Sequence, residues 1–174
     1  PIIDPNFKNE IITKGLPASS GVVTGKVVFD SKALKKFSNK NHNTILVLKE
    51  TSPNDVNAMN QSTGVLTCQG GMTSHAAVVA RGLNKTCVTG ARDIKIDFEN
   101  KRFHCGGLFI VEGDIITING GNGEVLIGDA PTKIPTLSEA LLQIVKWSEA
   151  INKNKSEDII GFLEETQEII KKNK

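Results

Sequence analysis

The stretch QGGMTSHAAVVARG (residues 69–82) is the most informative part of the sequence for the fold. Two glycines and two hydroxyl residues precede His75, and a run of Ala and Val follows it as far as Gly82. Thr73 or Ser74 can cap a helix, because a short hydroxyl side chain accepts a hydrogen bond from the free amides of the first turn. The stretch therefore predicts a short helix that begins near His75.

Strands are predicted on both sides of this helix. β-Branched runs bounded by turn residues are typical of strands, and the clearest are GKVVF (25–29), TILVLKE (44–50), GVLTC (64–68) and KTCVTG (85–90). Ser52 and Pro53 predict the start of another short helix over NDVNAMNQ, since proline fits the first helical turn. Residues 113–128 are typical of a hairpin, because the Gly- and Asn-rich turn at 119–123 adopts positive φ easily. Together these signals indicate an α/β domain with a mixed sheet.

The pattern changes to a helical period after Pro131. The first apolar face is formed by Leu137, Leu141, Ile144, Trp147 and Ile151, and a second by Ile159, Ile160, Leu163, Ile169 and Ile170. We therefore expect a domain over residues 1–130 and a helical linker or extension over 131–174. Acidic residues lie on these helices as well, so a helical hairpin that packs on itself or on the domain is favoured over a membrane-surface role.

The composition limits the class of protein and its partners. A length of 174 residues suits one domain with an appendage, and a net charge of +2 gives no broad footprint for nucleic acid or an anionic membrane. No apolar run reaches the roughly 18 residues that a bilayer span needs. Three cysteines without framework spacing indicate reduced thiols. We expect a cytoplasmic protein, or an organellar one if a targeting signal lies outside this chain, which starts at Pro1 like a piece of a longer protein.

The residues around His75 favour binding of an anion. Gly70 and Gly71 lack a Cβ, so the backbone can turn sharply and approach a ligand closely. Unpaired amides and the positive end of the helix dipole then attract negative charge, with phosphate as the obvious candidate. A neutral imidazole nitrogen is a nucleophile near pH 7, so His75 could itself carry a phosphoryl group.

Three other interpretations of His75 remain open on local chemistry. Serine nucleophile chemistry is disfavoured, because Ser74 and His75 are adjacent and G-x-S-x-G is missing. A metal site fails the usual paired spacing; its candidate ligands are Cys68, His75, Cys87, His104 and Cys105. A histidine that only caps a helix is the strongest alternative. Cys87 itself fits a buried small hydrophobic residue better than a site residue.

A longer resemblance favours the carrier role. The segment GGMTSHAAVVARG (70–82) resembles the signature of the phosphohistidine swivelling domain of phosphoenolpyruvate-utilising enzymes. Within that family Met72 and LNKTCVTGARDI (83–94) are most similar to pyruvate phosphate dikinases, whereas phosphoenolpyruvate synthases commonly have Arg at the position of Met72. The likeness runs in order from about residue 12 to 130. Gln69 stands where these dikinases usually have Arg, so a charged phosphate contact at position 69 is not implied.

The resemblance implies a swivelling β/β/α domain in which His75 is phosphorylated from ATP in an ATP-grasp module. The phosphoryl group would then pass reversibly to pyruvate in a (β/α)8 module, giving phosphoenolpyruvate; phosphate and Mg²⁺ would be bound by these partner modules and not by this chain. Gly70, Gly71, Thr73, Ser74 and Arg81 would position the phosphoryl group, although Arg81 is equally consistent with a surface residue at the helix end. The parent protein would be a homodimer.

Two further expectations follow from the resemblance. Thr73 resembles the hydroxyl residue, two positions before the carrier histidine, at which plant dikinases are phosphorylated for regulation. A carrier that serves two sites needs hinges, which we expect at residues 12–15 and 129–136. The alternatives are a docking module of the same fold without chemistry, and the carrier domain of a related phosphoenolpyruvate synthase.

Overall fold

The computed structural model describes residues 2–3, 10–38, 40 and 42–133. The chain divides into two compact units, Pro1–Ile134 and Pro135–Lys174, and all described residues belong to the first. The expected helices beyond residue 133 therefore lie outside the described residues. Within the expected helical extension, Thr132–Lys133 form a strand (β13) and not a helix, because they pair antiparallel with β1 (Ile2–Ile3).

The centre of the described fold is an eight-stranded mixed sheet in the order β2-β12-β11-β4-β5-β6-β7-β3. Its strands are β2 (Ile11–Lys14), β3 (Leu16–Ser19), β4 (Val22–Val28), β5 (Thr44–Leu48), β6 (Gly64–Thr67), β7 (Thr86–Thr89), β11 (Ile115–Asn119) and β12 (Glu124–Ile127). Strands β4 to β7 are parallel neighbours, and all other pairs are antiparallel. The four predicted strands and the predicted hairpin are confirmed.

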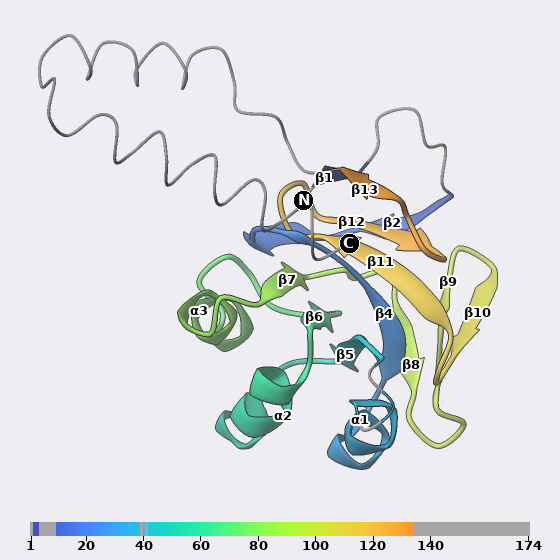
Figure 1. Cartoon of the computed structure of the whole chain (residues 1–174), viewed down its shortest axis with the longest axis horizontal. Coiled ribbons are helices and arrows are strands. Elements are labelled where there is room, and N and C mark those ends of the chain that lie inside the picture. Colours follow the sequence, from blue (N-terminus) through green and yellow to red (C-terminus); the bar gives the residue numbers. More distant parts are fainter. Residues whose placement is uncertain (1, 4–9, 39, 41, 134–174) are drawn as a thin grey trace, which may run out of the picture. The chain divides into compact units, whose positions relative to one another are not determined.

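Helices cover one face of the parallel strands (Figure 1). They are α1 (Ser31–Ser38), the 3-10 turn η1 (Pro53–Asp55) with α2 (Val56–Gln61), and α3 (His75–Gly82). A three-stranded sheet of β8 (Lys95–Asp97), β9 (Arg102–Cys105) and β10 (Leu108–Val111) covers the other face. The predicted β/β/α arrangement is therefore correct. No described helix is both long and apolar enough to cross a bilayer.

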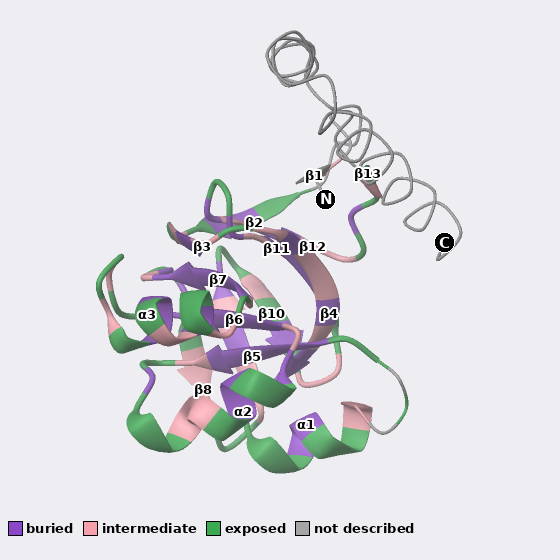
Figure 2. Cartoon of the chain, turned by 60° about the vertical axis from the view of Figure 1, so that its left-hand side comes forward, coloured by how far each residue is buried: buried purple, intermediate pink, exposed green. Residues whose placement is uncertain are grey.

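Two apolar cores follow from the alternation of side chains along the buried strands. Leu46, Val65 and Cys87 pack toward the helices. Their neighbours in sequence, among them Ile45 and Leu66, pack toward the small sheet. Both sets are fully or almost fully buried, and Figure 2 shows β5, β6 and β7 as the buried middle layer. Strands covered on both faces read as continuous hydrophobic runs, which is why TILVL and GVLT were recognisable in the sequence.

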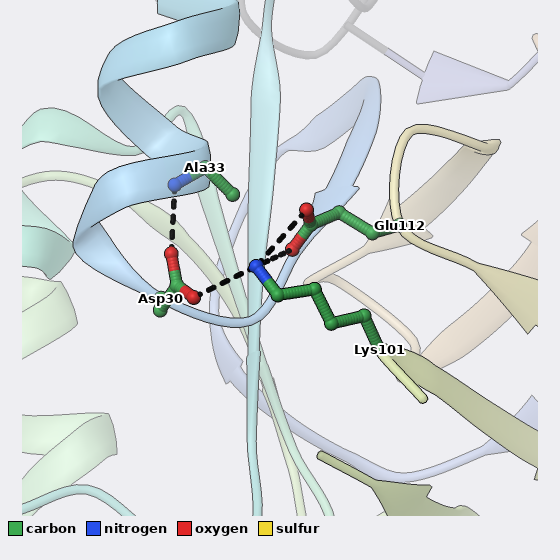
Figure 3. A network of polar contacts seen from close by, with 4 residues as sticks. All are labelled: Asp30, Ala33, Lys101 and Glu112. Atoms are coloured by element: carbon green, nitrogen blue, oxygen red, sulfur yellow. Dashed lines mark hydrogen bonds and ion pairs between the residues drawn. The ribbon is translucent and has the colours of Figure 1, made fainter. Parts of the chain in front are cut away.

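Helix α1 was not predicted, and a polar network explains where it begins (Figure 3). Asp30 Oδ1 accepts a hydrogen bond of 2.7 Å from the Ala33 amide, which is the contact of a helix cap. Lys101 Nζ lies 3.0 Å from Asp30 Oδ2 and 3.3 Å from Glu112 Oε1. The network joins the start of α1 to the small sheet, because Lys101 and Glu112 lie next to β9 and β10.

The expected hinge at residues 12–15 is wrong. Thr13 and Lys14 pair with β12, and Gly15 donates its amide to the Gly123 carbonyl at 2.8 Å. Ile12 is 9% exposed and belongs to the core on the side of the small sheet. This segment is a strand of the large sheet and not a flexible connection.

Candidate functional site

His75 lies at the edge of the sheet where the parallel strands end. Strand β6 ends at Thr67, residues 68–74 form a loop, and α3 then leads back to the parallel strand β7. The crevice beyond the carboxyl ends of parallel strands is the usual place for a ligand in α/β folds. The topology alone therefore places His75 where an open α/β sheet binds its ligands.

The first part of the loop is fixed by backbone contacts. The Gln69 amide donates to the Lys49 carbonyl at 2.8 Å, and Thr67 Oγ1 donates to the Gln69 carbonyl at 2.7 Å. Gly70 has φ +113°, which side chains of other residues rarely allow, whereas Gly71 has no positive φ. A Cβ on Gly90 would lie 2.7 Å from the Gly70 carbonyl oxygen. The sharp turn thus comes from Gly70, and the close approach of a neighbouring segment depends on Gly90.

The predicted helix start is confirmed. Ser74 is the N-cap of α3, and its side chain accepts a hydrogen bond of 3.4 Å from the Ala77 amide. The Ser74 amide in turn donates to the Gly71 carbonyl at 3.0 Å. His75 is the first residue of the helix, so it lies beside the amides that a helix leaves unpaired and at the positive end of the dipole.

Arg81, near the end of α3, holds the loop through hydrogen bonds to two backbone carbonyls. Its Nε donates to the Ala18 carbonyl at 2.7 Å, and its terminal nitrogen donates to the Met72 carbonyl. These bonds connect the loop before His75, the last turn of α3 and strand β3. The structure therefore shows Arg81 holding the loop in place, with two of its donors committed to backbone oxygens.

The side chains at the tip of the loop are free to meet a ligand. Thr73 and His75 are exposed, and neither side chain has a hydrogen-bond partner within the described part of the chain. A histidine retained only to satisfy the helix end would be expected to bond to it. Here the Ser74 hydroxyl does that instead, which leaves both imidazole nitrogens available.

The alternative metal ligands are not brought together. Cys68 and Cys105 lie in the core on the side of the small sheet, and Cys87 lies in the core under the helices. His104 contacts Phe109 in a tilted arrangement with ring centroids 5.0 Å apart. Burial raises the pKa of Cys87 to about 12, so this thiol stays neutral near pH 7. Among the described residues, no group of three or more His, Cys, Asp or Glu side chains is placed to hold a metal ion.

Sequence reasoning missed the residues that support the loop from a distance. Ala18 lies 63 positions from Arg81 and accepts the hydrogen bond through its backbone carbonyl. Every residue type has such a carbonyl, so the sequence could not indicate this contact. Gly90 had a weak signal, because a glycine directly after a buried strand often marks a close backbone approach.

Comparison with known proteins agrees with this arrangement. Residues 40–123 match the family described as "PEP-utilising enzyme, mobile domain". Residues 40–123 therefore carry the mobile domain of PEP-utilising enzymes.

The curated relatives that the chain matches are pyruvate, phosphate dikinases. It is 46% identical over 150 residues to that of Rickettsia typhi and 44% identical over 150 residues to that of Rhizobium meliloti, covering 86% of this chain and 17% of the relative in each case. It is 42% identical over 153 residues to "Pyruvate, phosphate dikinase 1, chloroplastic" of Arabidopsis thaliana, covering 87% of this chain and 16% of the relative. The chain thus spans only about a sixth of the length of these relatives.

Among solved structures, the chain is similar to one described as "N-terminal domain of Enzyme 1 - Nitrogen". The two share 14% identity with a TM-score of 0.44, over 80% of this chain and 99% of that one. The likeness is too distant to add to the family assignment.

Proposed function

We propose that this chain is the phosphocarrier domain of a pyruvate phosphate dikinase and that His75 carries the phosphoryl group. The observation on which this rests is an exposed imidazole at the N-terminus of α3 that has no partner among the described residues and is held there by a tightly bonded loop. The amides of the first turn would stabilise the phosphoryl oxygens, by about 0.3–2 kcal/mol from the dipole.

The proposed chemistry is a relay in two steps. A ring nitrogen of His75 attacks a phosphorus atom of the ATP-derived donor, and the N–P bond forms as the P–O bond to the leaving group breaks. The enolate oxygen of pyruvate then attacks the same phosphorus, which releases the imidazole and yields phosphoenolpyruvate. Thr73, Ser74 and the backbone at Gly70 and Gly71 would orient the phosphoryl group, while Arg81 keeps the loop in position.

The remaining parts of the reaction belong to the rest of a longer protein. The relatives are about six times as long as the aligned segment, which leaves room for an ATP-grasp module and a (β/α)8 module. ATP, pyruvate, phosphate and Mg²⁺ would bind to those modules. We further propose that the parent protein is a homodimer, in the cytoplasm or in an organelle, and that this chain alone does not turn over substrate.

Formation of phosphohistidine tests this function directly. The chain, mixed with the ATP-grasp portion of a dikinase, ATP and Mg²⁺, should gain one phosphate that is labile in acid and stable in base. His75→Ala should abolish this labelling and change the free energy of unfolding by no more than about 0.5 kcal/mol, because the side chain is exposed.

The other exposed histidine provides the matched control. His42→Ala removes an imidazole from a loop far from α3 in sequence and should label like the original chain. Labelling that survives in His75→Ala would refute the carrier role. A folded chain that never becomes labelled would favour a docking module without chemistry.

We also propose that Thr73 is a regulatory phosphorylation site. Its hydroxyl is exposed and unpaired among the described residues, two positions before His75. A phosphate on Thr73 would add roughly 1.5 to 2 negative charges beside the incoming phosphoryl group and repel it. Thr73→Asp should therefore slow labelling of His75 more than Thr73→Val does, because both variants lose the hydroxyl and only Asp adds negative charge; equal rates in the two variants would exclude this mechanism.

A further inference from the structure

A cleft of about 650 Å³ opens beside the His75 loop, at the same edge of the large sheet. One wall is the ends of β5 and β6, including Lys49 and the start of the loop at Gly70. The other wall is the segment that follows β7 and continues into β8. His75 does not line the cleft, so the proposed carrier function leaves it unexplained.

Three cationic side chains from separate elements line this cleft, and no acidic side chain does. They are Lys49 after β5, Arg92 after β7 and Lys95 in β8, and all three are exposed. None of them makes an ion pair with another described residue. Like charges that face a common cleft repel one another, and an anion would relieve that repulsion.

Two acidic side chains of the segment after β7 are engaged away from the cleft. Asp93 accepts a hydrogen bond of 3.0 Å from Thr13 Oγ1, and Asp97 Oδ2 lies 3.1 Å from Arg102 Nε. The positive charge of the cleft is therefore not neutralised by these carboxylates.

An apolar surface lies next to the cations in the same cleft. Ile94 is 3% exposed and Ile96 is half-buried, while Phe98 is 50% exposed. The Phe98 ring is held edge-on against Phe29, with centroids 6.3 Å apart and an interplanar angle of 82°. A half-exposed ring that is fixed by a buried one offers a flat surface to a ligand without a large loss of side-chain entropy.

We propose that this cleft binds a small organic anion with a flat apolar body, such as an aromatic carboxylate, sulfonate or phosphate. Lys49, Arg92 and Lys95 hold the anionic group, and Phe98 with the two isoleucines contacts the ring. The volume is that of a typical small-molecule site, and the place is the crevice at the carboxyl ends of parallel strands. The inference goes beyond phosphoryl transfer and does not depend on it.

Binding can be measured on the chain itself with naphthalene-2-sulfonate as the probe. In a ¹H–¹⁵N NMR titration we expect saturable shifts of the amides of Ile94, Ile96 and Phe98. Uncharged 2-naphthol and inorganic sulfate should each bind at least about tenfold more weakly, because each keeps only half of the required chemistry.

Charge-reversal variants assign the site. The double variant Arg92→Glu with Lys95→Glu should lower the affinity for the probe by about tenfold or more. The matched control, Lys32→Glu with Lys35→Glu, makes the same change of charge on exposed positions of α1 and should leave the affinity unchanged. Phe98→Ser should lower the affinity for the probe and leave the affinity for sulfate unchanged. If the double reversal lowers the melting temperature, Lys49→Glu repeats the test from another element.

Three results would overturn the proposal. They are equal affinity for 2-naphthol and the sulfonate, unchanged affinity after reversal of the cleft charges in a folded variant, and saturable shifts confined to amides outside the cleft.

Discussion

At the scale of single residues, the position of His75 depends on glycines as well as on polar contacts. Gly70 turns the chain at φ +113°, and Gly90 lets the neighbouring segment approach its carbonyl. The sequence predicted a helix start near His75 with a cap at Thr73 or Ser74, because both are local patterns, and the structure places the cap at Ser74. It could not predict the bonds of Arg81, whose acceptors are backbone oxygens chosen by the fold.

The two adjacent glycines make a matched pair for a stability measurement. Gly70→Ala should lower the free energy of unfolding by about 1–3 kcal/mol, because alanine is strained at a φ of +113° and its Cβ would lie 3.1 Å from Ser74 Cβ. Gly71→Ala meets no atom within 4 Å and has no positive φ, so its effect should stay within about 0.5 kcal/mol. Chemical denaturation of both variants measures the difference, and similar losses would show that Gly70 is not specially required.

At the scale of elements, the buried parallel strands were predictable and the peripheral ones were not. Strands with two covered faces have an unbroken apolar run, as in β5. Strands β8 to β10 are three or four residues long and mix exposed, half-buried and buried side chains, so their pattern is weak. Strand β2 was interpreted as a hinge because only its pairing with β12, more than a hundred residues later, makes it part of the sheet.

Two neighbouring isoleucines test whether β2 belongs to the rigid body. Ile12 is 9% exposed and Ile11 is 52% exposed, since successive side chains of a strand point to opposite faces. Ile12→Asn should cost about 3 kcal/mol of stability, from lost apolar packing and a buried amide. Ile11→Asn should cost no more than about 0.5 kcal/mol. Equal melting temperatures for the two variants would restore this segment as a flexible connection.

The cap of α1 should make stability depend on pH. The hydrogen bond from the Ala33 amide, followed by Lys101, holds the pKa of Asp30 below its ordinary value of 3.8. A carboxyl group with a lowered pKa in the folded state stabilises the fold fully above its unfolded pKa, and this contribution is lost as the pH falls through the folded pKa.

Two variants separate the cap from the charge. At pH 7, Asp30→Ala should lower the free energy of unfolding by about 1 kcal/mol, as the loss of other helix caps does. Asp30→Asn keeps a capping oxygen and should lose less, because the ion pair with Lys101 is largely exposed. The difference between Asp30→Asn and the original chain should begin to shrink near pH 3.8 and disappear once the pH has fallen through the lowered pKa of Asp30 in the folded state. A difference that is constant from pH 7 to pH 2 would show that the carboxylate charge plays no part.

At the scale of the whole molecule, the described body begins and ends in one short ladder. Ile3 lies opposite Thr132, and Ile2 lies opposite Lys133. The expected hinge at 129–136 is fixed to the body in its first part, because the Ala130 amide donates to Thr117 Oγ1 at 3.0 Å. No part of the sequence indicated this, since two-residue strands carry no periodicity.

A disulfide can test the ladder. Ile3→Cys with Thr132→Cys places two cysteines at directly opposite positions of an antiparallel pair, where the Cα separation suits a disulfide. The oxidised variant should be more stable than the reduced one by about 2–4 kcal/mol, measured by denaturation with and without a reductant. Failure of the thiols to join under oxidising conditions would show that the two strands are not neighbours.

The ladder also determines how the body responds to a pull. Strands β1 and β13 are antiparallel, and their outer ends meet at the pair of Ile2 and Lys133. Tension applied to these two ends would therefore break the two residue pairs in sequence and not simultaneously by shear. Each released residue can add about 3.5 Å to the extended length of the chain, so the four residues of the ladder together add roughly 14 Å. We expect these two pairs to open before the longer pairing of β2 with β12, so that the loop that presents His75 stays undistorted.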